Sequence, residues 1–254
     1  MTRPRVICHM ATSIDGRIVV YGWPESASVR REYERVHASY GADGWLCGRV
    51  TMEPFAGGLR PDEEVARQHP GGAAREDFVA PGEHDSFAFA IDASGRLAWE
   101  TNDIDGDHVV AILSERVSDE YLAFLHARGV SYILAGARDV DLPVALGKIG
   151  DRFGVKVLML EGGGRINGGM LAAGLIDEVS VLVAPTVDGA SERPRSSTST
   201  AMASRRAASL SSTWSIARMT CFGCATTSSR GRRGSDVRCC SREHGRSAPV
   251  QESL

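Results

Sequence analysis

The stretch VKVLMLEGGGRIN, residues 155–167, decides the fold expected for this chain, because it joins a buried strand to a helix through three glycines. Apolar residues 157–160 suit a strand that is covered on both faces, and apolar residues at helical spacing follow over 168–176. Glycines at such a junction let the backbone approach a ligand closely, and the first N–H groups of the helix have no partner within it. The stretch predicts either a phosphate-type anion site or a tight turn without a ligand, and the motif alone leaves both open.

A second junction of the same kind is GWLCGRVTME, residues 44–53, in which a short apolar run ends at Gly48 and is followed by Arg49 and Thr51. A guanidinium and a hydroxyl are groups that bind phosphate. Strand-like and helix-like segments alternate along the rest of the chain as far as residue 189. This alternation predicts one α/β domain over residues 1–189, with a mainly parallel central sheet and helices on both faces.

Apolar periodicity and turn residues give the expected bounds of these segments. The expected strands cover 6–10, 44–48, 86–91, 108–113, 130–134, 157–160 and 177–185, and the expected helices cover 26–40, 62–68, 118–127, 142–149 and 168–176.

Composition and the N-terminus predict an ordinary globular protein. The chain has 254 residues, of which 43% are hydrophobic, enough for one large domain. No apolar run is long enough to cross a bilayer, and residues 1–5 lead into a strand-like segment without the apolar core of a signal peptide. We therefore expect a cytoplasmic protein that has no membrane partner.

Residues 190–254 have a different composition from the rest of the chain. They carry 11 Arg, no Lys and 4 acidic residues, whereas residues 1–189 carry 18 basic and 28 acidic residues. No strand or helix pattern is evident in this segment, and it has few aliphatic residues for a core. We expect an irregular tail that is either disordered or translated in a shifted reading frame.

Three common ligand motifs fail on spacing. An EF-hand loop starting at Asp103 would need glycine and glutamate where His108 and Ser114 stand, so this segment is expected to be a turn. The Cys-x-x-Cys pair at 221–224 is followed by adjacent cysteines at 239–240, which is the wrong spacing for zinc. Neither glycine junction has the Gly-x-Gly-x-x-Gly pattern after the first strand that a Rossmann domain requires. We expect no metal and no Rossmann fold.

The two junctions belong to a larger set of motifs. This set comprises ATSIDGR at 11–17, GRVTME at 48–53, ILSE at 112–115, LEGGGRIN at 160–167 and GLIDE at 174–178. Together the motifs resemble the dihydrofolate-reductase-like family, in particular the reductase domain that forms the C-terminal part of the bifunctional deaminase-reductase of riboflavin biosynthesis. The resemblance covers about residues 5–189 and implies a stand-alone form, because its pattern begins at residue 5.

This resemblance implies a three-layer fold, a homodimer and NADPH as the cofactor. It implies that the glycine turn and helix start bind the pyrophosphate, that a serine lies near the adenosine 2′-phosphate, and that Glu161 contacts the substrate. The implied cofactor residues are Ala11, Gly48, Arg49, Thr51, Ser114, Gly163, Gly164, Arg165, Ile166 and Asn167. No catalytic acid is named, since the cofactor supplies the hydride and the protein orients it.

Departures from the family pattern concern the substrate. The riboflavin enzymes follow the threonine with an Asp-Pro-x-Leu-x-x-Arg type of segment that helps to hold the ribose phosphate, whereas EPFAGG stands here at 53–58. His37 stands where a further basic residue is expected late in the first helix. The expected function is NADPH-dependent hydride transfer to a pterin- or ribosylamino-pyrimidine-like small molecule, resembling the 5-amino-6-(5-phosphoribosylamino)uracil reductase step. The substrate itself is left open.

The tail offers two alternatives to an active enzyme. A shift of one base lets residues 194–203 encode Ala-Leu-Phe-Asp-Ile-Asp-Gly-Asp-Gly and residues 219–226 encode Asp-Val-Leu-Trp-Leu-Arg-Tyr, a strand-like string. We therefore hypothesise an insertion or deletion near 190–195, which would make the chain a non-catalytic product of a damaged gene that retains a nucleotide site. A basic tail that binds nucleic acid is the other alternative, disfavoured because aromatic residues are not interleaved with the arginines.

Overall fold

The computed structural model describes residues 3–18, 26–60, 62–68, 75–187, 208–209 and 215–220. All of them lie in the first of two units, Met1–Gly223, and the second unit, Cys224–Leu254, lies outside the described residues. The helices are α1 (Ser26–Ala38), α2 (Arg49–Met52), α3 (Asp62–Gln68), α4 (Asp119–Ala127), α5 (Leu142–Phe153) and α6 (Gly164–Ala172). The strands are β1 (Arg5–Thr12), β2 (Gly44–Gly48), β3 (Phe87–Ile91), β4 (Asp103–Ile104), β5 (Asp107–Leu113), β6 (Ser131–Leu134), β7 (Val157–Gly162), β8 (Glu178–Val183), β9 (Thr186–Val187), β10 (Ala208–Ser209) and β11 (Ser215–Thr220).

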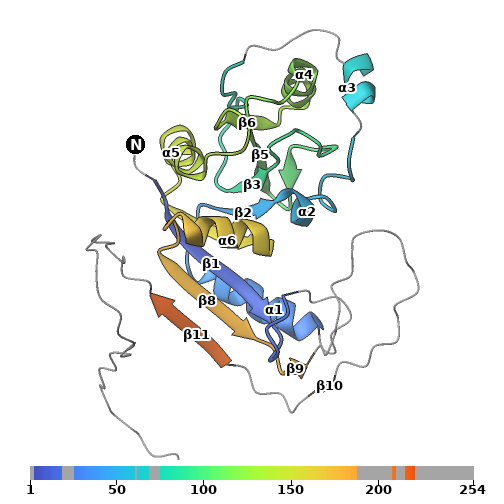
Figure 1. The fold of residues 1–254 in the computed structure, drawn as a ribbon. Helices are drawn as coiled ribbons and strands as arrows, with labels where there is room; N and C mark the ends of the chain where they lie inside the picture. Colours follow the sequence, from blue (N-terminus) through green and yellow to red (C-terminus); the bar gives the residue numbers. More distant parts are fainter. Residues whose placement is uncertain are drawn as a thin grey trace, which may run out of the picture. The chain divides into compact units, whose positions relative to one another are not determined.

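A central sheet runs through the described part of the chain in the order β11-β8-β1-β7-β2-β3-β5-β4, with β6 paired to β5 (Figure 1). Every pairing from β8 across to β6 is parallel, and the strands β11 and β4 pair antiparallel with β8 and β5. The side chain of Asp43 accepts the N–H groups of Lys156 at 2.7 Å and Val157 at 2.8 Å, which fixes the starts of β2 and β7 side by side. The expected mainly parallel sheet is confirmed.

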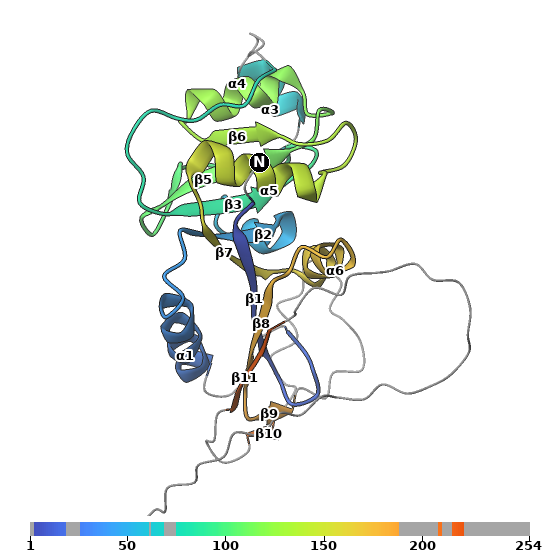
Figure 2. The same ribbon diagram turned by 90° about the vertical axis from the view of Figure 1, so that its left-hand side faces the viewer.

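Helices cover both faces of this sheet, as expected (Figures 1 and 2). On one face, α5 and α6 pack against alternate residues of the strands, among them Leu46, Leu158 and Leu160. On the other face, α2 and α4 enclose a core that includes the buried Trp99. The helix α1 lies on this second face over β1 and β8, where Val29 packs against buried residues of both strands. The result is the three-layer arrangement that the sequence predicts.

Local signals explain where the helices begin and end. The hydroxyl of Ser118 accepts the Tyr121 N–H at 3.2 Å and caps α4, and the carboxylate of Asp141 accepts the Val144 N–H at 3.1 Å and caps α5. Gly154 ends α5 in the left-handed conformation with φ of 69°. No helix among the described residues is long and apolar enough to span a bilayer.

Two expectations about the elements are wrong. The sequence pattern places the last helix from residue 168, but α6 begins at Gly164, because Ile166 and Met170 pack into the core and hold the glycine-rich first turn helical. An irregular tail after residue 190 is also wrong for two segments, since β10 pairs with β9 and β11 pairs with β8 along its whole length. The free edge of β8 offers unpaired backbone groups that β11 satisfies. The other tail residues, including the cysteine motif, lie outside the described residues.

Candidate functional site

The two glycine junctions meet at one edge of the sheet. Because β2 and β7 are parallel neighbours, the starts of α2 and α6 lie together at their carboxyl ends. The end of β2 and the start of α6 are so close that a Cβ atom at Gly48 would lie 2.8 Å from Cγ1 of Ile166. The hydroxyl of Thr51 lies 3.4 Å from where a Cβ atom of Gly163 would stand. The structure thus brings the residues of both predicted motifs into one place.

The glycine turn has the geometry of an anion site. Gly163 caps α6 with φ of 78°, a left-handed value that favours glycine, and its carbonyl accepts the N–H groups of Ile166 at 3.0 Å and Asn167 at 3.2 Å. The amides of Gly164 and Arg165 precede these, so no acceptor within the helix is available to them. The side-chain oxygen of Asn167 is buried and has no hydrogen-bond partner among the described residues. The two amides fit a phosphate-bearing ligand, and the Asn167 oxygen, which is an acceptor, fits a hydrogen-bond donor.

The other predicted cofactor residues lie along the same carboxyl edge but are not all available to a ligand. Ala11 is buried near the end of β1, beneath α1. Arg49 opens α2, and its guanidinium lies 3.7 Å from the carboxylate of Glu53. Ser114 follows β5, roughly 14 Å from β7 at the usual strand spacing. Its side chain is fully buried and donates to the carbonyl oxygen of Ala93 at 2.6 Å, and its role near a 2′-phosphate stays a prediction.

Glu161 stands at an irregularity of β7. The register pairs Leu46 with Leu160 but Cys47 with Gly162, so that Glu161 is an extra residue on β7, a β-bulge. Such bulges bend a strand and redirect a side chain, and they are frequent beside active sites. Directly before the glycine turn, the bulge presents the Glu161 carboxylate to α1, where its Oε1 atom lies 2.5 Å from Nδ1 of His37.

The helix α1 is held in place beneath this carboxylate by paired contacts with β1. The ring of His9 stacks on Tyr33 with centroids 4.1 Å apart, and the phenol of Tyr33 donates to the His9 carbonyl oxygen at 3.0 Å. One ring nitrogen of His9 lies 3.0 Å from the hydroxyl of Ser180 on β8, and the other lies 3.3 Å from the carbonyl oxygen of Tyr33. Tyr33 and His37 are four residues apart, so they share one face of the helix.

Burial and the Glu161 charge set the ionisation of this cluster. The hydrogen bond with Glu161 raises the pKa of His37, whereas burial lowers the pKa of His9. Burial and, after it, the Glu161 carboxylate raise the pKa of both Tyr33 and Cys47. At neutral pH the cluster therefore holds neutral His9, Tyr33 and Cys47 around one carboxylate, with His37 biased toward its protonated form.

The sequence predicts Glu161 as a site residue but does not reveal this cluster. His37 is 124 residues away from Glu161 in the chain. The helical spacing of Val29, Tyr33, Val36 and Tyr40 predicts an apolar face, yet it does not show that His37 points to β7. Nothing in the local sequence signals the bulge either, since a register is a property of two strands.

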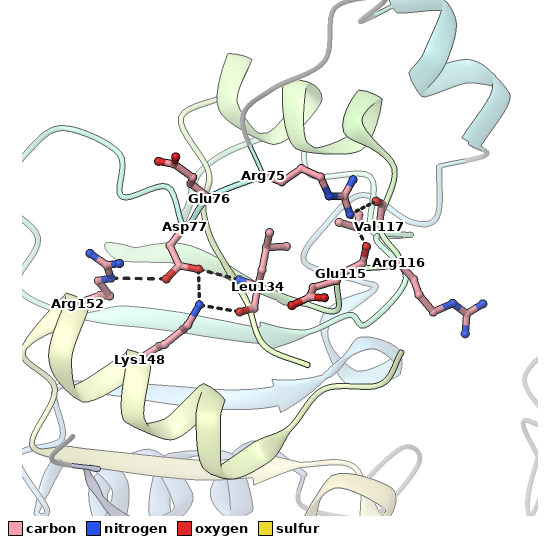
Figure 3. Close-up of a pocket in the computed structure, with 9 residues that line it drawn as sticks. All are labelled: Arg75, Glu76, Asp77, Glu115, Arg116, Val117, Leu134, Lys148 and Arg152. Atoms are coloured by element: carbon pink, nitrogen blue, oxygen red, sulfur yellow. Dashed lines mark hydrogen bonds and ion pairs between the residues drawn. The ribbon is translucent and has the colours of Figure 1, made fainter. Parts of the chain in front are cut away.

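A polar pocket of about 940 Å³ lies elsewhere, beside the ends of β5 and β6 and against α5 (Figure 3). Several of its charges are already paired: Asp77 accepts from Lys148 at 2.8 Å and from the Leu134 N–H at 3.0 Å, and Nε of Arg152 lies 3.5 Å from the same carboxylate. Arg75 pairs with Asp119 and with backbone carbonyls. None of the predicted site residues lines it. We interpret this pocket as an ionic cluster that attaches the loop before β3 to the sheet.

Comparison with known proteins supports the class of the fold. The family described as RibD C-terminal domain matches residues 4–224. A 2,5-diamino-6-ribosylamino-4(3H)-pyrimidinone 5′-phosphate reductase from Methanothermobacter thermautotrophicus is 30% identical over 189 residues, which cover 74% of this chain and 80% of the relative. Acinetobacter baumannii RibD has a similar fold, with a TM-score of 0.50 and 20% identity over 75% of this chain. The chain spans about half of that RibD, 48%.

The fold and the comparisons together define an α/β oxidoreductase. The chain belongs to the RibD C-terminal domain family. The family match continues past residue 189, where the resemblance described from the sequence ends, and includes β10 and β11.

Proposed function

We propose that this protein is an NADPH-dependent reductase that transfers a hydride to a ribosylamino-pyrimidine or a related pterin-like molecule. The observation that carries the proposal is that the bulged Glu161 stands directly before a glycine turn with anion-binding geometry, at the point where the second junction meets it. A nucleotide phosphate and a substrate acceptor would then lie next to each other. Bringing the two reactants together is the main task of the protein in hydride transfer.

The chain's own residues divide the binding between them. The first amides of α6, with Thr51 and Asn167 beside them, would hold the pyrophosphate, and Arg49 adds a positive charge. The bound nicotinamide supplies the hydride. The backbone at Gly162 leaves no room for a side chain, because its Cβ atom would lie 2.7 Å from the sulfur of Cys47. The close backbone approach and the first amides of α6 both fit such a cofactor.

The Glu161 carboxylate would orient the substrate by accepting its N–H groups. A hydrogen bond to an ionised acceptor is stronger than one between neutral groups, and aminopyrimidines and pterins carry several such donors. The relative from Methanothermobacter is named for a pyrimidinone phosphate, whereas segment 53–58 of this chain lacks the basic residue expected to hold a ribose phosphate. The proposal therefore covers heterocycles with and without that phosphate.

The test has a binding arm and a turnover arm. NADPH at a hundred times its Kd should stabilise the fold by about 2.7 kcal/mol, which a thermal-shift measurement reads as a rise in Tm of several degrees. NADPH oxidation is then followed with the pyrimidinone phosphate, with the phosphoribosylamino-uracil and with a dihydropterin, and NADH serves as the control cofactor. Absence of any NADPH-dependent shift would refute the proposed cofactor. A shift without turnover of any substrate would refute the proposed reaction.

Two further properties are proposed alongside the reaction. We propose a homodimer in the cytoplasm, on the family resemblance. Light scattering after size-exclusion chromatography would measure a monomer mass if the first part of this proposal is wrong.

A further inference from the structure

The contact between His37 and Glu161 is more than a surface ion pair. The two side chains are 30% and 15% exposed, and their closest atoms are 2.5 Å apart. Each comes from an element that is fixed independently of the contact: Glu161 from the bulge in β7, and His37 from a helix that is tied to β1 through Tyr33 and His9. Surface pairs on flexible side chains contribute little, because holding both chains costs entropy. Here the backbone on both sides is held already.

A carboxylate that recognises a planar ring must present its oxygens in one plane and in one ionisation state. The bond to Nδ1 occupies Oε1 of Glu161 and restrains the rotation of the carboxyl group. In the proposed site, Oε2 is then the oxygen that would accept from a ligand. Directional acceptors of this kind discriminate ligands by the N–H groups that they carry.

We propose that His37 is a positioning residue of the substrate site, which holds the Glu161 carboxylate in one orientation as the acceptor for N–H donors of a heterocyclic substrate. This rests on the proposed function, and it adds to it the residue that governs the recognition step. His37 acts through Glu161 rather than on the reacting atoms.

The charges around His37 give the pair a defined pH dependence. Glu161 of β7 and Asp107 at the start of β5 both favour the imidazolium, and the remaining titratable neighbours, His9 on β1, Tyr33 on α1 and Cys47 on β2, are neutral near pH 7. The hydrogen bond with Glu161 raises the pKa of His37 above its ordinary value. The charged pair is thus complete below that raised pKa and is lost as the pH rises through it.

The first test needs no substrate. The full chain is labelled with ¹⁵N-histidine, and the His37 ring is titrated by NMR in the unmodified protein and in Glu161→Gln. We expect a pKa above the ordinary histidine value that falls toward or below it in the variant. An equal pKa in both proteins overturns the proposal whether or not the enzyme turns over the substrates tested.

The second test separates positioning from folding. His37→Ala should raise KM for the pyrimidine substrate roughly tenfold or more while kcat and the KM for NADPH change little, because a uniform binding interaction is lost. His37→Asn keeps an N–H donor near the place of Nδ1 without the charge, so it should recover part of the affinity and lose the decline of kcat/KM at high pH. Arg35→Ala, which removes an exposed pair with Glu32 on the same helix, is the matched control.

The outcomes distinguish the two proposals. An active unmodified protein whose substrate KM is unchanged in His37→Ala overturns the role of His37. A protein inactive toward every substrate overturns the proposed function, and the NMR titration then decides the pair by itself. A fall in Tm without a change in KM marks the pair as purely structural and also overturns the role.

Discussion

Replacing Gly48 by alanine tests whether the two glycine junctions act as one unit. The added Cβ atom would lie 2.8 Å from Ile166 Cγ1 and 3.7 Å from the carbonyl oxygen of Gly162. Carbon atoms in contact are about 3.5–4.0 Å apart, so the start of α6 must retreat by roughly 0.7–1.2 Å, unless Ile166 leaves its rotamer. Overpacking of this kind costs about 1–3 kcal/mol. Since α6 carries the amides of the proposed anion site, we expect the affinity for NADPH to fall about tenfold, which is about 1.4 kcal/mol.

A double-mutant cycle assigns this loss to the contact itself. Ile166→Ala removes the atom that Gly48→Ala would meet, so the double variant should recover NADPH affinity and lose less stability than the two single variants add up to, by about 1 kcal/mol or more. Binding is measured by calorimetry and stability by urea unfolding.

Gly168→Ala is the matched control for this cycle. It lies on the same helix, and a Cβ atom there has no neighbour within 4 Å. It should keep the NADPH affinity and gain up to about 1 kcal/mol of stability. Unchanged affinity in Gly48→Ala, or strictly additive losses in the double variant, would show that the junctions do not act together.

Buried groups and the last strand predict how stability responds elsewhere in the fold. Burial, with His84 beside it, lowers the pKa of His108 to about 4, so the stability of the neutral ring is complete above its unfolded pKa of about 6.5 and is lost as the pH falls toward 4. In His108→Gln the urea midpoint should depend less on pH over this range. An unchanged dependence on pH would show that His108 is not the group responsible. Asp77→Asn should cost about 1–3 kcal/mol because the Lys148 ammonium loses its buried partner, and an unaltered urea midpoint would show that the ionic cluster contributes nothing. Truncation after Gly189 should lower Tm and promote aggregation, because it removes β11 and exposes the edge of β8, and an equal Tm would argue against that pairing.

Most of the regular elements could be predicted from local sequence, because their periodicity and their capping residues agree. The expected bounds of β2 and α3 match the structure, and α4 begins directly after its capping residue Ser118. The start of α6 could not be predicted in this way, since glycines oppose a helix locally and only packing of Ile166 against β2 and the core overrides them. β11 escapes prediction for a similar reason: it forms where β8 offers an edge, and its own sequence is weakly strand-like.

The candidate site divides in the same way. Its phosphate-facing half follows from two short motifs, since parallel strands place their carboxyl ends at one edge and the helices after β2 and β7 must begin there. Its substrate half depends on register and long-range contact. A bulge between two strands makes Glu161 face α1. The packing of α1 on β1 brings His37 into contact with it. Residue spacing contains neither fact, so Glu161 is predicted by family resemblance, and the contact of His37 with it is shown only by the structure.

The strand β11 is relevant to the hypothesis that the tail is translated in a shifted reading frame. The register sets Ser215–Thr220 opposite Val183–Glu178, so the backbone edge of β8 is paired as the chain is encoded. On β8, Glu178, Ser180 and Leu182 are buried, but the valines that alternate with them stay half-buried. A strand reading Asp-Val-Leu-Trp-Leu-Arg-Tyr, which the shifted frame permits at 219–226, carries more apolar surface for such a face, and each Å² removed from water contributes about 25 cal/mol. The hypothesis of a shift near 190–195 therefore predicts that the gene, read in the other frame, continues without an early stop through this string and that the restored protein has a higher Tm. A stop codon before the string would remove the hypothesis, and β11 as encoded would then be the native edge of the sheet.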